Sequence, residues 1–333
     1  MPFTPPQSVR TLALFSPLLL LGAWRGADDE PDYAAWRASI LAAAREGEPQ
    51  VAGALPEHWI DGTDCATEDA WQVHRYERDT YVLRQSKCVI YEAPFLFLLI
   101  GEERAFLLDT GANGNVDVWA TVRGVLEQWS AETGRPAPPL LVGHSHSHFD
   151  HVLGDKWFRD QEGVEGVVGL RRQDVLEHWG FEDYPNDVRR LELGGRSVDI
   201  LGVPGHQPAS IALYDRRTQL LLTGDIVYPG HLFVFGEEEW PEFVASIQRL
   251  VDWAREHPVR HVLGCHVEYS NTPGEPYAYG TEAHPDEHPL ELTPTALVDI
   301  LEAAHAQDGD PEFAIHDEFV LHPVYKHEIT WNG

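Results

Sequence analysis

The feature that most limits what this chain can fold into is a dense histidine cluster, which comprises His144, His146, His148, Asp150 and His151. The cluster directly follows the apolar stretch 140–142, which is typical of a short buried strand. Alternate residues of an extended chain point to the same side, so His146 and His148 can hold one ion together. A turn into a helix near Asp150 would direct Asp150 and His151 towards a neighbouring ion. A histidine run can also be a compositional accident or an adventitious surface tract, but its place after a buried strand favours a built metal site.

Three further candidate ligands stand where apolar stretches end. His206 lies in a Pro-Gly-His turn, Asp225 ends a Thr-Gly-Asp sequence, and His266 follows a Val-Leu-Gly-Cys sequence. A single histidine at a strand end is more often a capping or surface residue. Three separate strand endings of this kind, after one histidine cluster, favour a common site.

The order of these motifs is HxHxDH, then PGHxxxS, then TGD, then a strand-borne histidine. This order resembles the metallo-β-lactamase superfamily over roughly residues 95–266. Asp109-Thr110-Gly111 is also similar to the early DTG element of that family. The resemblance implies an α+β fold, the four-layer αββα metallo-β-lactamase sandwich. In that fold two sheets pack face to face with helices outside, and metals sit on loops at one edge.

The resemblance also implies a ligand assignment. The first metal would be bound by His146, His148 and His206. The second metal would be bound by Asp150, His151 and His266, and Asp225 would bridge both. The cofactors expected are therefore two divalent metal ions. Histidine-rich ligation favours zinc (Zn2+), although iron (Fe) and manganese (Mn) occupy similar sites.

Two polar residues near the motifs fall outside this ligand set. His144 is expected to be buried and hydrogen bonded, with the orientation of a ligand as the alternative. Asp109 is expected to orient a histidine or a loop group rather than to bind metal directly.

The metals imply the chemistry. A metal-bridged hydroxide is a nucleophile near neutral pH, and Asp150 is the candidate catalytic residue because it can orient that nucleophile or move a proton. We therefore expect a dinuclear metal-dependent hydrolase that acts on an ester, thioester or lactone. The bridging Asp225 resembles the glyoxalase II-like, lactonase-like and phosphodiesterase-like branches, whereas the antibiotic-hydrolysing branches usually lack a carboxylate there. A β-lactamase or phosphodiesterase of the same fold is the alternative.

Two other interpretations belong to different classes. An iron-dependent, sulfur dioxygenase-like oxidoreductase would use one ion, and the complete two-metal set argues against it. A non-catalytic binding module would be expected to have lost ligands, whereas this sequence retains all seven.

The sequence assigns no substrate-binding residue. Segment 270–292 is rich in Pro, Gly, Glu and His, and it is a candidate lid over the site. Six aromatic residues could face the substrate, and packing on the core explains them equally well. They are Tyr228, Phe233, Phe235, Tyr269, Tyr277 and Tyr279.

Charge restricts the partners. The 333 residues carry a formal net charge of −30, which repels phosphate backbones, so a small-molecule substrate is expected and nucleic acid is not. The sequence does not indicate the oligomeric state.

The N-terminus and the cysteines bear on localisation. Residues 1–27 combine Arg10 with the apolar run 12–24, which is typical of a signal peptide. We expect an exported protein, periplasmic or secreted, with no stable membrane insertion of the mature chain; a cytoplasmic protein with an N-terminal extension is the alternative. After export, Cys65 and Cys88 could pair and leave Cys265 free, but three buried thiols are equally consistent with the sequence.

The remaining chain, 28–333, is expected to form a single domain with its core at about 70–270 and a C-terminal loop and helix extension at 270–333. Helices are predicted at 28–47, 116–129, 155–159, 173–179, 240–256 and 294–304. Strands are predicted at 71–76, 81–83, 88–91, 95–100, 105–108, 140–142, 198–201, 211–214, 220–222, 261–263 and 318–320.

Overall fold

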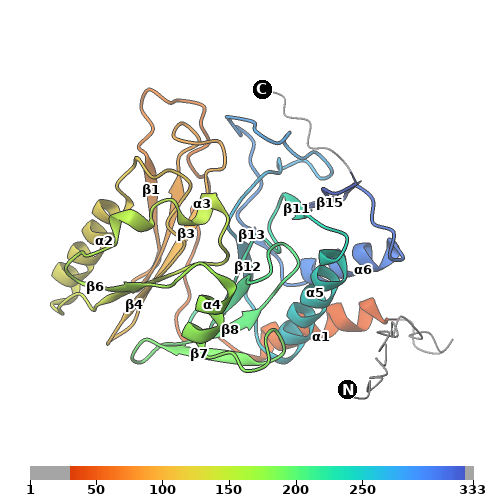
Figure 1. Ribbon diagram of the computed structural model, residues 1–333, viewed down its shortest axis with the longest axis horizontal. Helices are drawn as coiled ribbons and strands as arrows, with labels where there is room; N and C mark the ends of the chain where they lie inside the picture. The colour runs from red at the N-terminus through yellow and green to blue at the C-terminus, as the bar shows by residue number, and fades with distance from the viewer. Residues whose placement is uncertain (1–30, 327–333) are drawn as a thin grey trace, which may run out of the picture. The chain divides into compact units, whose positions relative to one another are not determined.

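Two six-stranded β-sheets form the core of the computed structural model, which describes residues 31–326 (Figure 1). The first sheet contains, in spatial order, β1 (Trp71–Glu77), β2 (Thr80–Gln85), β3 (Phe95–Ile100), β4 (Ala105–Leu108), β5 (Leu140–Gly143) and β6 (Val164–Val167). The second contains β13 (Glu291–Leu292), β12 (His261–Gly264), β10 (Leu220–Gly224), β9 (Ile211–Asp215), β8 (Ser197–Gly202) and β7 (Val188–Glu192).

Seven helical segments accompany the two sheets within residues 31–326. They are α1 (Tyr33–Glu46), α2 (Val118–Thr133), α3 (Phe149–Val152), a 3-10 turn η1 (Asp155–Trp157), α4 (Arg172–Trp179), α5 (Glu239–Glu256) and α6 (Ala296–Ala306). Residues of both sheets, such as Phe97 and Leu213, share one buried cluster, so the sheets pack face to face. A second cluster joins the outer face of the first sheet to α2. A third joins the second sheet to α1, α5 and α6. The layers are therefore helix, sheet, sheet, helix, which confirms the predicted α+β sandwich.

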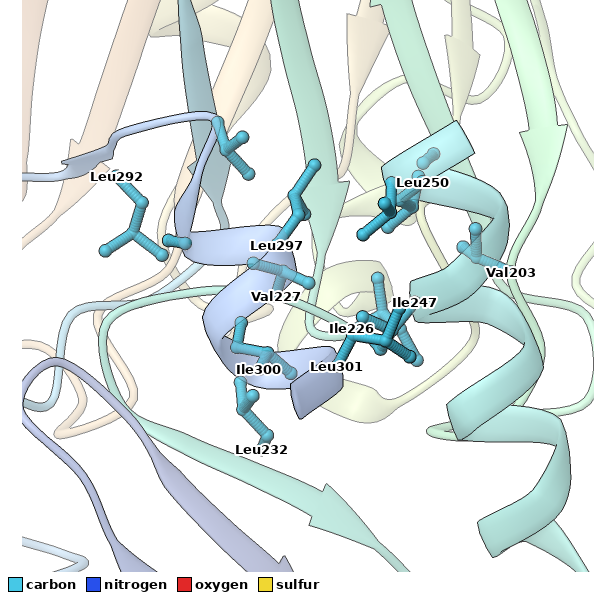
Figure 2. Close-up of a cluster of buried hydrophobic side chains, with 14 of the residues drawn as sticks. Val203, Ile226, Val227, Leu232, Ile247, Leu250, Leu292, Leu297, Ile300 and Leu301 are labelled. Atoms are coloured by element: carbon cyan, nitrogen blue, oxygen red, sulfur yellow. The ribbon is translucent and has the colours of Figure 1, made fainter. Parts of the chain in front are cut away.

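The helical layer on the second sheet follows directly from sequence periodicity. Ile247, Leu250 and Ala254 recur at helical spacing on α5 and are buried. Figure 2 shows Ile247 and Leu250 in the same cluster as Leu297 and Leu301 of α6. Truncating one such buried leucine to alanine typically costs about 2–5 kcal/mol, so this layer holds the second sheet firmly.

Strand direction brings the predicted ligands to one edge. In the second sheet, β8 and β10 are both antiparallel to β9, and β10 is parallel to β12. Strands β8, β10 and β12 therefore run in the same direction and end on the same side. Ser145, two residues after β5, reaches this edge of the second sheet, because its carbonyl accepts a hydrogen bond from Ile211 at the start of β9 and its Cβ would lie 2.7 Å from a Cβ at Gly224, the last residue of β10.

A smaller three-stranded sheet lies beyond this edge. Its order is β11 (His231–Val234), β15 (Val320–Pro323) and β14 (Ala314–Ile315). Its last two strands come from the C-terminal extension, so the extension is part of the fold around β11.

The predicted strand at 88–91 was wrong. The amides of Val89 and Ile90 both donate to the Ser86 carbonyl, at 3.0 and 3.2 Å, so this apolar stretch forms a turn. The helix expected at 155–159 is only the short turn η1.

Other differences concern short elements. Strands β6, β7, β11, β13 and β14 were not predicted, and β15 begins two residues later than the strand expected at 318–320. Residues 1–27, the predicted signal peptide, lie outside the described residues. Within residues 31–326, none of the helices combines the length and the hydropathy that crossing a bilayer requires.

Candidate metal centre

The seven predicted ligands converge at the shared edge of the two sheets. One group contains His146, His148 and His206, and the other contains Asp150, His151, Asp225 and His266. Within each group, one potential ligand atom per residue lies within 4.8 Å of every other. All seven side chains are buried except that of His148, which is partly exposed. The division agrees with the two ligand sets that the family resemblance implied, and Asp225 falls with the second.

Asp225 lies between the two groups. Its Oδ2 atom is 3.7 Å from Nε2 of His146 and 3.7 Å from Nε2 of His206. The same oxygen is 3.2 Å from Nε2 of His151 and 3.5 Å from Nε2 of His266. One carboxylate oxygen is thus within reach of imidazoles from both groups.

Two glycines allow close packing next to candidate ligands, Gly224 against the residues after β5 and Gly205 against helix α5. Gly224 has φ +57°, and a Cβ there would lie 2.7 Å from the Cβ of Ser145. Gly205 has φ +130°, and a Cβ there would lie 2.4 Å from the Cα of Phe243. A side chain at either position would be strained and would displace Asp225 or His206, its neighbour in the chain.

The outer nitrogens of two histidines are held by carbonyl groups. His206 Nδ1 lies 2.9 Å from the Phe233 carbonyl oxygen, and His266 Nδ1 lies 2.9 Å from that of Glu92. A carbonyl only accepts, so Nδ1 carries the hydrogen in each ring. In the neutral tautomer, Nε2 therefore presents its lone pair to the centre.

Asp109 holds a third histidine. Its Oδ2 accepts from His151 Nδ1 at 2.9 Å and from Cys265 Sγ at 3.2 Å. Its carboxylate also accepts from the backbone and the hydroxyl of Ser145, at 2.8 and 2.9 Å. Asp109 is therefore in the position expected of it, beside a predicted ligand and outside both groups.

Several polar atoms that face the centre could bind a cation. His146 Nε2 and Asp225 Oδ1 are buried without a hydrogen-bond partner among residues 31–326. His148 Nδ1 and His206 Nε2 face each other at 3.0 Å. A buried polar atom left unpaired costs about 1–3 kcal/mol, and a cation among these nitrogens and oxygens would remove that cost. The donor set therefore fits a divalent metal.

Electrostatics within the cluster depend on the carboxylates. Burial lowers the pKa of His146 well below its ordinary value, and it lowers the pKa of His206 to about 4. Burial alone would raise the pKa of Asp225, but the charge on His151 and then on His266 holds it well below its usual range. Burial alone would lower the pKa of His151 and His266, but the charges of Asp225 and Asp150 raise it well above its ordinary value, so a bound metal would displace protons from these two rings.

His144 lies outside both groups. Its Nε2 is 2.8 Å from Oδ1 of Asp155, which also accepts from the Thr110 hydroxyl at 2.9 Å. The residue is buried and hydrogen bonded, as expected.

Three of the six candidate aromatic residues pack inside the protein. Tyr269 donates to the His316 carbonyl at 2.5 Å, and the Tyr277 ring stacks on His284 with 3.9 Å between centroids. Tyr228 is buried. The remaining three lie near the candidate ligands: the Phe235 ring contacts two of them, Phe233 adjoins Phe235, and Tyr279 adjoins Phe233.

Glu92 was missed by the sequence analysis. Its carbonyl accepts from His266, and its carboxylate accepts from the Tyr279 hydroxyl at 3.0 Å. Burial raises its pKa to about 7; the charge of His266 opposes this effect and that of Asp150 adds to it. Glu92 stands in a turn with no characteristic spacing to the ligand motifs, so no sequence signal marked it.

Comparison with known proteins agrees with this geometry. A family model described as the metallo-beta-lactamase superfamily matches residues 93–262, about half of the chain. The chain therefore belongs to the metallo-β-lactamase superfamily.

Two curated relatives are enzymes by name. The chain is 26% identical over 209 residues to acyl-coenzyme A thioesterase MBLAC2 from Homo sapiens, covering 51% of this chain and 72% of that protein. It is 28% identical over 127 residues to a hydroxyacylglutathione hydrolase from Ectopseudomonas mendocina, covering 38% of this chain and 44% of that protein. Among solved structures, a metallo-beta-lactamase from Pontibacter korlensis matches at 14% identity with a TM-score of 0.47, over 71% of this chain and 100% of that one.

Proposed function

We propose that this chain is a metal-dependent hydrolase with a dinuclear centre. The residues assigned to the two ions are His146, His148 and His206 for the first, Asp150, His151 and His266 for the second, and Asp225 for both. The observation that carries the proposal is the position of Asp225 Oδ2, within 3.7 Å of imidazole nitrogens from each group. Histidine-rich ligation favours zinc, and iron or manganese would be accepted by the same donors.

Two divalent ions in these groups would lower the pKa of water, to give a nucleophile near neutral pH, and would polarise a substrate carbonyl. Asp225 fixes the separation of the two groups, because it directly follows β10. Asp150 is assigned the proton-transfer role. Its side chain belongs to the second group but remains 10% exposed, so it can exchange a proton with solvent.

The substrate class we propose is a carboxylic thioester, ester or lactone. The names of the two curated relatives, a thioesterase and a hydroxyacylglutathione hydrolase, support cleavage of an acyl substrate. A phosphodiester and a β-lactam remain the alternatives within the superfamily.

The test is elemental analysis of protein purified without chelators, together with a panel of thioester, ester, lactone, phosphodiester and β-lactam substrates. We expect two equivalents of metal per chain and turnover of the acyl substrates. Asp225→Asn should lose metal and should lower kcat by more than about 100-fold, because even outer partners of metal ligands cost 10–100-fold. Asp160→Asn is the matched control, since Asp160 is exposed, and at its φ of +59° asparagine is equally well tolerated.

Other outcomes would replace the proposal. One equivalent of iron with oxygen consumption would indicate the dioxygenase class instead. Metal-free protein that gains no activity on reconstitution with zinc, iron or manganese would contradict any catalytic role for the seven residues.

A further inference from the structure

A row of aromatic rings lies along β11 and the residue that follows it. Strand residues alternate between two sides, and Leu232 and Val234 belong to the buried cluster under α5 and α6. Phe233 and Phe235 therefore project to the opposite side. Their rings are roughly parallel, with an interplanar angle of 23° and 6.1 Å between centroids.

This row contacts the first group of candidate ligands. The Phe235 ring centroid lies 5.4 Å from those of both His148 and His206. The Phe233 carbonyl accepts the hydrogen bond from His206 Nδ1. The same strand thus positions a ligand through its backbone and presents apolar rings beside it.

The row also reaches the second group. The Tyr279 ring lies against Phe233, with 5.6 Å between centroids. The Tyr279 hydroxyl donates to Glu92, whose carbonyl holds His266. We call Phe233, Phe235 and Tyr279 the aromatic wall, since the three rings run from one group of candidate ligands towards the other.

Exposure and charge indicate what the wall would bind. Phe235 is 45% exposed although it touches two histidines that are otherwise largely enclosed. Phe233 is only 8% exposed, because it packs against the rings of His322 and His231. Among the Arg and Lys contacts with aromatic rings within residues 31–326, none involves Phe233 or Phe235, and the Tyr279 hydroxyl at the far end of the wall donates to the carboxyl group of Glu92. The exposed ring of Phe235, beside a polar centre and with no Lys or Arg over it, suits an uncharged hydrocarbon group.

We propose that the aromatic wall is an acyl subsite, which binds the uncharged hydrocarbon chain of a substrate whose carbonyl carbon lies at the metal centre. This inference rests on the proposed hydrolase function and narrows its substrate class to acyl groups longer than acetyl. Phe235 is the specificity-determining residue, because its exposed ring has the most surface left to cover.

The size of the effect follows from the burial of methylene groups. Full burial of one methylene is worth about fourfold in affinity, and a wall open on one side gives about half that free energy, or about twofold. From acetyl to octanoyl, kcat/KM should therefore rise by roughly 60-fold at about twofold for each added methylene.

The experiment measures kcat/KM for straight-chain acyl thioesters of N-acetylcysteamine, a neutral leaving group, from acetyl to decanoyl. In Phe235→Ala, we expect the loss to grow with chain length, from under about threefold for acetyl to more than about tenfold for octanoyl. Phe235→Leu should recover much of the increase of kcat/KM with acyl-chain length. Leu41→Ala is the matched control, because Leu41 lies on α1 and is 42% exposed.

A second measurement keeps the inference separate from the proposed function. Calorimetric binding of straight-chain carboxylates to the zinc-loaded protein should tighten with chain length, and Phe235→Ala should flatten that series too. Acyl turnover with no dependence on chain length would overturn the subsite and leave the hydrolase intact. Chain-length-dependent binding without turnover of any substrate would support the subsite and count against the hydrolase.

Discussion

Asp109 combines complete burial with an unusual backbone conformation. It is fully buried and has φ +68°, a left-handed conformation that aspartate tolerates better than most residues. Its carboxylate accepts from Ser145, which follows β5, and from Cys265, which follows β12, as well as from His151. One side chain therefore links the ends of both sheets to a candidate ligand.

Replacing Asp109 tests that link. In Asp109→Ala, His151 loses the acceptor that fixes its Nδ1 hydrogen, so zinc affinity should fall by about 10–100-fold. Buried donors on Ser145 would also lose their partner, which costs about 1–3 kcal/mol each. Competition with a chelating dye measures the affinity, and urea unfolding measures the stability.

The zinc affinity and the stability of Asp109→Asn should lie between those of the wild type and of Asp109→Ala, because asparagine keeps an acceptor oxygen and tolerates positive φ. If Asp109→Ala bound zinc as tightly as the wild type, Asp109 would have no orienting role.

At this scale, sequence patterns identified what motif spacing can mark. All seven candidate ligands and Asp109 stand in recognisable strand-end motifs. Glu92 and the position of Phe235 could not be predicted. Glu92 holds His266 through a backbone carbonyl, and the Phe235 ring contacts the His148 ring at 5.4 Å between centroids. Neither contact requires a particular spacing, so it becomes visible only when the strands are assembled.

Among the elements, segment 270–292 is fixed to the first sheet. Arg84 of β2 donates to both carboxylate oxygens of Glu287, at 2.5 and 2.8 Å, and the two side chains are 1% and 8% exposed. His284 of the same segment also bonds to Glu287, at 3.1 Å. A buried bidentate pair of this kind indicates that segment 270–292 is held in place and is not a hinged lid.

Breaking this pair should be costly. Glu287→Gln would leave the Arg84 charge buried without its counter-ion, and the free energy of unfolding should fall by about 3–5 kcal/mol at neutral pH. Burial alone would raise the pKa of Glu287, but the charge of Arg84 and the hydrogen bonds from it lower that pKa below its ordinary value of 4.5. Its contribution is therefore fully present above pH 4.5 and is lost as the pH falls through the lower, folded-state pKa.

The measurement is urea unfolding of wild type and Glu287→Gln from pH 7 downward, where the difference should shrink below about pH 4.5. The exposed pair between Arg75 and Glu132, with side chains 41% and 39% exposed, supplies the control. Glu132→Gln should leave the free energy of unfolding almost unchanged, because solvent screens an exposed ion pair. Equal losses in the two variants would contradict the anchoring role of Glu287.

Helices and strands could be predicted from the sequence where the spacing of apolar residues was regular over a long stretch. Helices α5 and α6 repeat apolar residues over several turns, and both were placed within two residues of their starts. Strand β7 was missed because its pattern is mostly polar and exposed, as suits a sheet edge. The stretch at 88–91 was mistaken for a strand because its apolar residues pack within a turn, whose backbone bonds no composition reveals.

On the scale of the whole molecule, one covalent link constrains the chain. Cys65 and Cys88 form a disulfide across 23 residues, and Cys265 is a buried free thiol. This matches the pairing that the sequence allowed for an exported protein. Structural disulfides persist mainly in oxidising compartments. We therefore propose that the protein matures outside the cytoplasm, although the described residues do not include the predicted signal peptide.

The disulfide makes this proposal measurable. Closing a loop of this length removes conformational entropy from the unfolded chain, so reduction should lower the free energy of unfolding by about 3 kcal/mol. The double variant Cys65→Ser/Cys88→Ser should show the same loss, and reductant should then have no further effect on it. Alkylation after denaturation should modify Cys265 alone before reduction and all three cysteines afterwards, as read by intact mass. Protein recovered from its producing cells with Cys65 and Cys88 both alkylated before reduction would place its maturation in a reducing compartment, and the same mass would report whether residues 1–27 had been removed.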